Sequence, residues 1–209
     1  MALGLNEGGG DFTPFIKYNA KAGRWYIREG EGSEAHDVEV QPDKMVFVAD
    51  IDNIEIGWIK FPQGGAPETA LAPATKMKPD RPADDFKSGF RLKIFSAANL
   101  DGLREWMASS TLVNGAINEL YDAYEKEVGN HAGECPVVRF TGAQPVVNKH
   151  GTNYKPGFEI VQWTARPAEF DGAEANPPAQ QQSAQATAAN DPPPPPPQQP
   201  AQAAEGVNF

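Results

Sequence analysis

The last 39 residues of the chain, 171–209, cannot build a packed core. They contain no Lys or Arg, four acidic residues and nine prolines, six of which are consecutive at 192–197. A segment of this composition buries too little apolar surface to offset its chain entropy. We therefore expect a disordered Pro/Gln/Ala-rich tail, and a loose, glycine-rich arm at 1–13. Residues 14–170 remain to fold, which is enough for one domain with a sizeable core.

The charge balance excludes a protein that is basic on all sides. Formal net charge is −10. The tail accounts for −4 of this, because it has four acids and no base, so −6 remains for residues 1–170. A uniformly basic nucleic-acid-binding surface does not fit this balance. A local basic groove still does, because the charge of one face decides binding and the net sum does not.

The single cysteine and the distribution of apolar residues indicate the compartment. Cys135 has no partner for an intrachain disulfide, which fits a reducing environment. No apolar run approaches ~18 residues, and residues 1–10 lack the basic-then-apolar layout of a signal peptide. We expect a soluble cytoplasmic protein that does not bind membranes.

The order of predicted elements is mainly β with an inserted helical segment. β-branched and aromatic runs with alternating polarity predict strands at 24–28, 43–50, 54–61 and 90–95. A proline-rich stretch at 62–82 is expected to be a long loop.

The period of the apolar residues changes to 3.6 over 99–128, which predicts helix. Ser109, Ser110 and Thr111 are expected to divide this segment into two helices. A final hairpin is predicted from strands at 136–140 and 157–163. Strands, a helical insertion and a hairpin are the order of a small β-barrel such as an OB-fold; a sandwich with an inserted helical pair has the same order.

Two of the predicted strands carry basic and aromatic side chains on the face away from the core, because successive strand residues point to opposite faces. These residues are Arg24, Tyr26 and Arg28 in the first strand, and Arg91, Lys93 and Phe95 in the fourth. Cations that follow phosphates and rings that stack on bases are what single-strand binding requires. The alternative is a solvated strand face whose bases pair with acids on neighbouring strands.

Two further groups extend the predicted nucleic-acid site. Trp58 and Lys60 are expected to continue the surface of the strands. The loop at 148–155, with Lys149, Tyr154 and Lys155, is expected to be a flexible finger that closes over a bound strand.

No catalytic or metal-binding constellation stands out. Asp50 and Asp52 have a spacing that metal-dependent nucleases use, but Asn53 and the flanking strands favour a turn. His131 and Cys135 are four residues apart, and two more ligands would have to come from distant loops, whereas structural zinc sites have paired short spacings. No P-loop or nucleophile motif occurs. We expect no catalytic residue, no metal and no cofactor.

With these residues in hand, the chain resembles the OB-fold single-stranded DNA-binding proteins of phages and prophages. The similarity lies in the layout: an aromatic and basic β-core, a helical segment, a hairpin at 136–163 that contains Gly151-Thr152-Asn153-Tyr154-Lys155-Pro156, and an unstructured tail. Residues 154–167, with Phe158-Glu159-Ile160 and Trp163, resemble that group most. The tip Gly206-Val207-Asn208-Phe209 is similar to the C-terminal Phe with which bacterial single-stranded DNA-binding proteins recruit replication partners. Here only Glu205, and no run of acids, precedes it.

The resemblance implies a non-catalytic, sequence-tolerant single-stranded DNA-binding protein of phage-type DNA replication or recombination, in the cytoplasm of a bacterial host. Val207, Asn208 and Phe209 would bind replication or recombination proteins, and a homo-oligomer is left open. The alternative is a β-barrel protein-interaction or virion-assembly module whose Pro-rich tail binds a partner. An enzyme is a third and weaker hypothesis.

Overall fold

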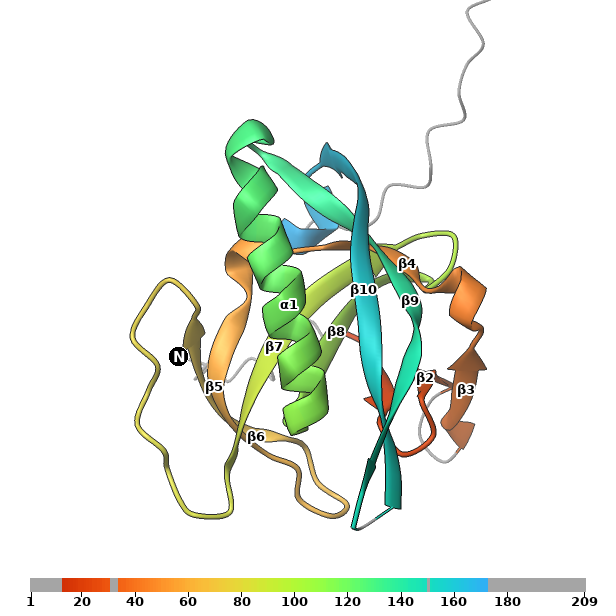
Figure 1. Ribbon diagram of the computed structural model, residues 1–209, viewed down its shortest axis with the longest axis vertical. Helices are drawn as coiled ribbons and strands as arrows, with labels where there is room; N and C mark the ends of the chain where they lie inside the picture. The colour runs from red at the N-terminus through yellow and green to blue at the C-terminus, as the bar shows by residue number, and fades with distance from the viewer. Residues whose placement is uncertain (1–12, 31–33, 150, 173–209) are drawn as a thin grey trace, which may run out of the picture. The chain divides into compact units, whose positions relative to one another are not determined.

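The computed structural model describes residues 13–30, 34–149 and 151–172 (Figure 1). Within these ranges the fold is mainly β, with one α-helix, which confirms the mainly β class, whereas the strand order does not close into the predicted barrel. The predicted arm before Thr13, the predicted disorder of the tail beyond Gly172 and the tip Val207-Asn208-Phe209 lie outside the described residues. None of the helices in the described ranges is long and apolar enough to span a bilayer.

The strands of the described ranges follow one another along the chain with a single helix before the last two. They are β1 (Phe15–Asn19), β2 (Arg24–Glu29), β3 (His36–Val40), β4 (Val46–Ala49), β5 (Glu55–Lys60), β6 (Glu68–Pro73), β7 (Lys87–Ser96), β8 (Gly102–Ala108), β9 (Glu134–Asn148) and β10 (Gly151–Ala165). The helix α1 spans Thr111–Glu127, and the short 3-10 helices include η3 (Ile51–Asn53) and η5 (Ala168–Asp171).

All strands belong to one sheet, in the order β10-β9-β4-β7-β8-β1-β2-β3, with β5 on β7 and β6 outside β5. The pairs are antiparallel except for β1 and β8. The path is open, since β3 and β10 are its two ends in the described part of the chain. The sheet is nevertheless strongly curved, as contacts between its two ends show. The ring centroid of Trp25 in β2 lies 5.9 Å from that of Phe140 in β9 and 6.2 Å from that of Phe158 in β10.

β7 is the central strand, and it pairs with three others. Its first half pairs with β5 and its second half with β4, while β8 runs along its other edge. Glycines make this crowded crossing possible. A Cβ at Gly57 would lie 2.1 Å from the Ala70 carbonyl oxygen, and one at Gly89 would lie 2.3 Å from the Ala108 carbonyl oxygen. Gly57 and Gly89 face each other across β5 and β7.

The core is built around aromatic rings on the inner face of the sheet. Trp25 and Trp106 are almost fully buried and touch with ring centroids 4.8 Å apart. Phe158 contacts both of them, so rings from β2, β8 and β10 meet at one point. Rings of this size dominate the apolar area that a core buries, and tilted contacts suit their quadrupoles.

Helix α1 packs against β10 through one apolar face (Figure 1). Val113, Ile117, Leu120 and Tyr124 are the buried members of that face. Their spacing of three or four residues matches one side of a helix. The second of the two predicted helices is therefore confirmed.

The first predicted helix is wrong, because residues 102–108 form strand β8. Leu103, Trp106 and Met107 have helical spacing, but Arg104, Trp106 and Ala108 alternate with equal regularity and all face inward. Trp106 lies opposite Leu92 of β7. In so short a run the period is ambiguous, and the position between β7 and β1 selects the strand.

Two predicted loops are also partly strands. The stretch 62–82 contains β6, which pairs with β5 over its whole length. The predicted finger at 148–155 is mostly the start of β10, where Tyr154 lies opposite Pro145 and Lys155 opposite Gln144. In both cases a neighbouring strand offers a full set of backbone partners, which outweighs the turn-forming composition.

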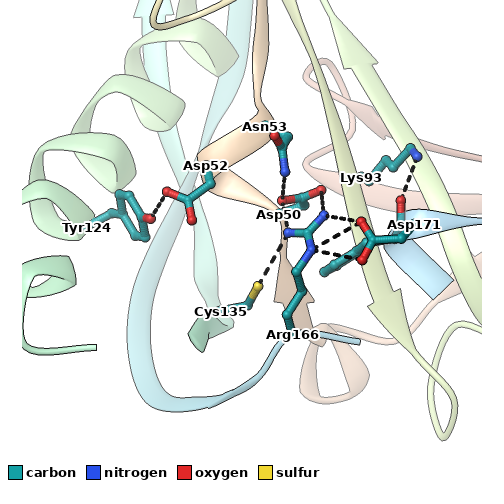
Figure 2. A network of polar contacts seen from close by, with 9 residues as sticks. Asp50, Asp52, Asn53, Lys93, Tyr124, Cys135, Arg166 and Asp171 are labelled. Atoms are coloured by element: carbon teal, nitrogen blue, oxygen red, sulfur yellow. Dashed lines mark hydrogen bonds and ion pairs between the residues drawn. The ribbon is translucent and has the colours of Figure 1, made fainter. Parts of the chain in front are cut away.

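The end of the described chain is fastened to the sheet by Arg166 (Figure 2). Its guanidinium donates to both carboxylate oxygens of Asp50 at 2.6 and 2.9 Å, and to Asp171 at 3.1 Å. Asp50 is 2 % exposed and also accepts a bond from Asn53 at 2.9 Å. Phe170 is buried beside the guanidinium. Asp171, which the sequence placed in the tail, is thus part of the folded domain.

Replacing Arg166 by Ala is expected to lower the free energy of unfolding by about 3–5 kcal/mol, because it leaves the buried Asp50 charge without its main partner. Urea denaturation measures this. Arg139→Ala is the control, since Arg139 forms an exposed ion pair with Glu159, and such pairs contribute about 0–1 kcal/mol. Equal losses in the two variants would show that the Asp50 pair is no more than a surface contact.

Candidate nucleic-acid interface

The two predicted basic strand faces lie on one surface of the sheet. In β2, Trp25 and Ile27 are buried, so Arg24, Tyr26 and Arg28 point away from the core. The buried residues of β7 are Phe90, Leu92 and Ile94, so Arg91, Lys93 and Phe95 point the same way. β8 and β1 lie between these two strands. We call this surface the outer face.

The strands between them continue the surface with residues of mixed charge. Lys93 lies opposite Glu105 of β8, and Glu105 lies opposite Phe15 of β1. Lys17 of β1 lies opposite Tyr26, with its ammonium 5.7 Å from the ring centroid. The sequence analysis missed Lys17, although the alternation of Ile16 and Tyr18 with polar neighbours is a strand signal.

Acids on neighbouring strands pair with most bases of the outer face. Arg24 lies 2.7 Å from Glu39, and Arg28 lies 3.7 Å from Asp37. Lys17 also pairs with Asp37. Arg91 bonds to Glu55 and lies 3.9 Å from Glu105. The cross-strand pairing that the sequence offered as an alternative is therefore present. The Arg24, Arg28 and Lys17 pairs are exposed, so salt and competing anions weaken them readily.

A hollow of about 530 Å³ opens in the outer face between β5, β7 and η5. Arg91, Lys93 and Arg166 supply its bases, and Glu55 and Glu105 are among its acids. Lys93 donates to the Phe170 carbonyl oxygen at 3.0 Å, which holds η5 beside β7 (Figure 2). The hollow therefore offers both donors and acceptors.

Glu105 is a largely buried acid on β8, between Arg91 and Lys93 of the outer face. Its side chain is 15 % exposed. Burial raises the pKa of this carboxyl, and the neighbouring Arg91 opposes the shift only in part. A proton on Glu105 would leave Arg91 and Lys93 with less competition for an external anion.

The other predicted site residues lie elsewhere. Trp58 lies opposite Ser88, an odd number of positions from the Glu55–Arg91 pair, so it faces the other side of the sheet. Lys60 lies 3.2 Å from Glu68 and 3.1 Å from Asp85. The prediction that Trp58 and Lys60 continue the surface of Arg91 is thus wrong, because one residue of alternation reverses the face.

The hairpin residues form a third group. Lys155 pairs with Glu119 of α1. The Tyr154 amide donates to the Ala20 carbonyl oxygen at 2.7 Å, which ties β10 to the turn after β1. Lys149 is exposed at the end of β9. Tyr154 and Lys155 are paired in the hairpin ladder, whereas Lys149 lies in the turn after β9, so most of the predicted finger is strand.

The acids and thiol considered as metal ligands have other partners. Asp50 binds Arg166, and Asp52 accepts a bond from the Tyr124 hydroxyl. His131 stacks on Trp163 with centroids 4.3 Å apart. Within the described ranges no group of three or more His, Cys, Asp or Glu is placed to hold a metal. No family model, no curated protein and no solved structure matches the chain.

Glu105→Gln is expected to alter the pH dependence of stability. A carboxyl whose folded pKa is raised contributes stability below its ordinary pKa and loses it as pH rises through the folded value. The variant should therefore gain stability relative to the wild type between pH 4 and pH 7. Urea midpoints at both pH values measure the change, with Glu125→Gln on α1 as the charge-matched control. A constant difference between E105Q and wild type would contradict the raised pKa.

Proposed function

We propose that the chain is a non-catalytic, sequence-tolerant single-stranded DNA-binding protein of phage-type replication or recombination, with an OB-fold-like arrangement of strands and the outer face as its DNA-binding surface. One observation carries the proposal. The basic and aromatic residues of β2 and β7 share one face of one sheet, although 60 or more residues separate them in the chain.

The chemistry of this face suits a single strand. Strands in a sheet are about 4.8 Å apart, so β2 and β7, three steps apart, are separated by roughly 14 Å. One nucleic-acid chain that crosses them can place phosphates on Arg24 or Arg28 and on Arg91 or Lys93. Tyr26 offers a ring on which a base can stack.

Binding would exchange one set of anions for another. Phosphates would replace Glu39, Asp37 and Glu55 as partners of the arginines. The Arg24 and Arg28 pairs are exposed, so their loss costs little. Displaced counterions and the nearby carboxylates both make such binding weaken steeply as salt rises.

The tail extends the proposal to protein partners. We propose that Val207, Asn208 and Phe209 bind replication or recombination proteins in the cytoplasm of a bacterial host. The last described residues lie beside β7, since Lys93 binds the Phe170 carbonyl oxygen.

A second candidate is a protein-interaction or virion-assembly module. The observation in its favour is the pairing of Arg24, Arg28 and Arg91 with carboxylates. In this reading the outer face is only a solvated surface. DNA-binding measurements separate the two candidates.

The wild-type chain is expected to bind oligo-dT more tightly than duplex of equal length, with log K falling linearly with log salt by about 0.7 per phosphate contact. Arg24→Gln combined with Arg28→Gln should reduce that slope by up to about 1.4. Fluorescence anisotropy of a labelled oligonucleotide measures both. Lys44→Gln with Lys126→Gln is the control, because these two exposed lysines lie in the 3-10 turn Pro42–Lys44 and in α1 and not on a strand of the outer face. Equal affinity for duplex, or a slope near zero, would refute the proposed function.

Tyr26→Ala is expected to weaken oligo-dT binding by about 1–3 kcal/mol, because a stacked base loses its ring. The salt slope should stay unchanged, since no phosphate contact is removed. Tyr26→Phe is the matched control and should bind like the wild type. If Y26A binds with full affinity while its thermal unfolding is normal, Tyr26 does not stack on DNA.

A further inference from the structure

Trp58 lines a groove of about 500 Å³ on the side of the sheet opposite to the outer face. Its walls come from β5, from the loop that precedes β7 and from the first turns of α1, with Arg81, Lys87 and Asn114 among them. In Figure 1, the beginning of α1 and the β5–β6 turn lie at the lower end of the molecule.

The indole of Trp58 is fixed between cations. Its Nε1 donates to the Pro79 carbonyl oxygen at 2.8 Å. The Lys78 ammonium lies 4.0 Å from the ring centroid, and the Arg81 guanidinium carbon lies 5.2 Å from it. The ring and two positive charges are therefore already arranged side by side before any ligand binds.

The two cations beside the Trp58 ring are bonded to neutral oxygens. Arg81 lines the groove itself, and Lys78 lines an adjoining hollow that shares Ser88 and Asn114 with it. Lys78 donates to the Ser88 hydroxyl at 2.8 Å, and Arg81 donates to the Phe86 carbonyl oxygen at 2.9 Å. In the described part of the chain, neither of these two has a carboxylate within ion-pair distance, whereas Arg24, Arg28 and Arg91 all do. Their charge is thus available to an external anion.

We infer that this groove is a second contact site for single-stranded nucleic acid, with Lys78 and Arg81 on phosphates and Trp58 stacked on a base. The inference rests on the proposed function and adds a site on the opposite side of the sheet. Charge complementarity selects the occupant: a polyanion with flat rings uses both the cations and the indole. The positive end of the α1 dipole adds attraction in the same sense.

Lys78 changes partner when the site fills. It covers the Trp58 ring in the free protein, and its bond to Ser88 is exposed and neutral. A base that stacks on the indole displaces the ammonium, which can then reach the phosphate next to that base. The stacking energy and the new ion pair replace one cation–π contact.

The test is oligo-dT binding by Lys78→Gln combined with Arg81→Gln, compared with the K44Q/K126Q control. The groove variant should bind severalfold more weakly at low salt, with a salt slope reduced by about 1.4. Trp58→Leu, which keeps an apolar side chain, should lose about 5- to 140-fold in affinity, the equivalent of 1–3 kcal/mol per stacked base. Thermal unfolding checks that each variant is folded.

Tryptophan fluorescence gives a readout that a structural role would not change. Oligo-dT should quench the wild type, and Trp58→Phe should lose most of that quenching, because Trp25 and Trp106 are buried and the partly buried Trp163 is stacked on His131 and does not line the groove. If the wild type binds oligo-dT but K78Q/R81Q binds equally well, the groove is not a contact site and the proposed function stands. If the wild type does not bind oligo-dT at all, the proposed function itself fails. Quenching by poly-glutamate and not by oligo-dT would assign the groove to an acidic polypeptide and overturn the inference.

Discussion

The fold depends on the close approach of three strands to β7. Gly89 allows β8 to approach, because a Cβ at this position would collide with the Ala108 carbonyl oxygen, and Gly57 allows β6 to approach β5 in the same way. With β5 and β4 sharing one edge and β8 on the other, β7 presents Phe90, Leu92 and Ile94 to the aromatic core. The same backbone holds Arg91 and Lys93 on the outer face. Core packing and site geometry thus follow from one strand, and a change that moves it alters both.

The sequence predicts the strands whose alternation is strong and leaves out those that only pairing defines. In β2, alternation predicts that Trp25 and Ile27 point to the core, and both side chains are buried. The seven residues of β8 fit both the 3.6-residue period of a helix and the two-residue period of a strand, so the sequence predicts a helix where the structure has a strand. β6 has little pattern of its own and becomes a strand beside β5. Local sequence sets the faces of a strand, whereas long-range neighbours decide whether a weak segment is a strand at all.

The candidate site shows the same division. Alternation within β2 and β7 identified their basic faces, and the sheet order places those faces together. Alternation within one strand does not predict that Glu39, Asp37 and Glu55 lie near the arginines. That placement depends on the register between two strands, which neither strand determines by itself. Nor does alternation alone show that Trp58 turns to the other side. Lys78 and Arg81 belong to the stretch 62–82, for which the sequence predicts a long loop without site residues. Their contact with the Trp58 indole becomes visible only in the folded chain.

Arg166 also has a mechanical consequence. The chain leaves β10, passes through η5 and continues toward residue 173, so a pull on the C-terminal segment meets the Arg166–Asp50 fork before it reaches the β9–β10 ladder. Two parallel hydrogen bonds and the buried Phe170 ring share that load. Force is then passed to η3 and β4 in the middle of the sheet, away from its open edge. Tension applied to the C-terminal segment is therefore borne by the Arg166–Asp50 contact before it can break the hydrogen bonds between β9 and β10.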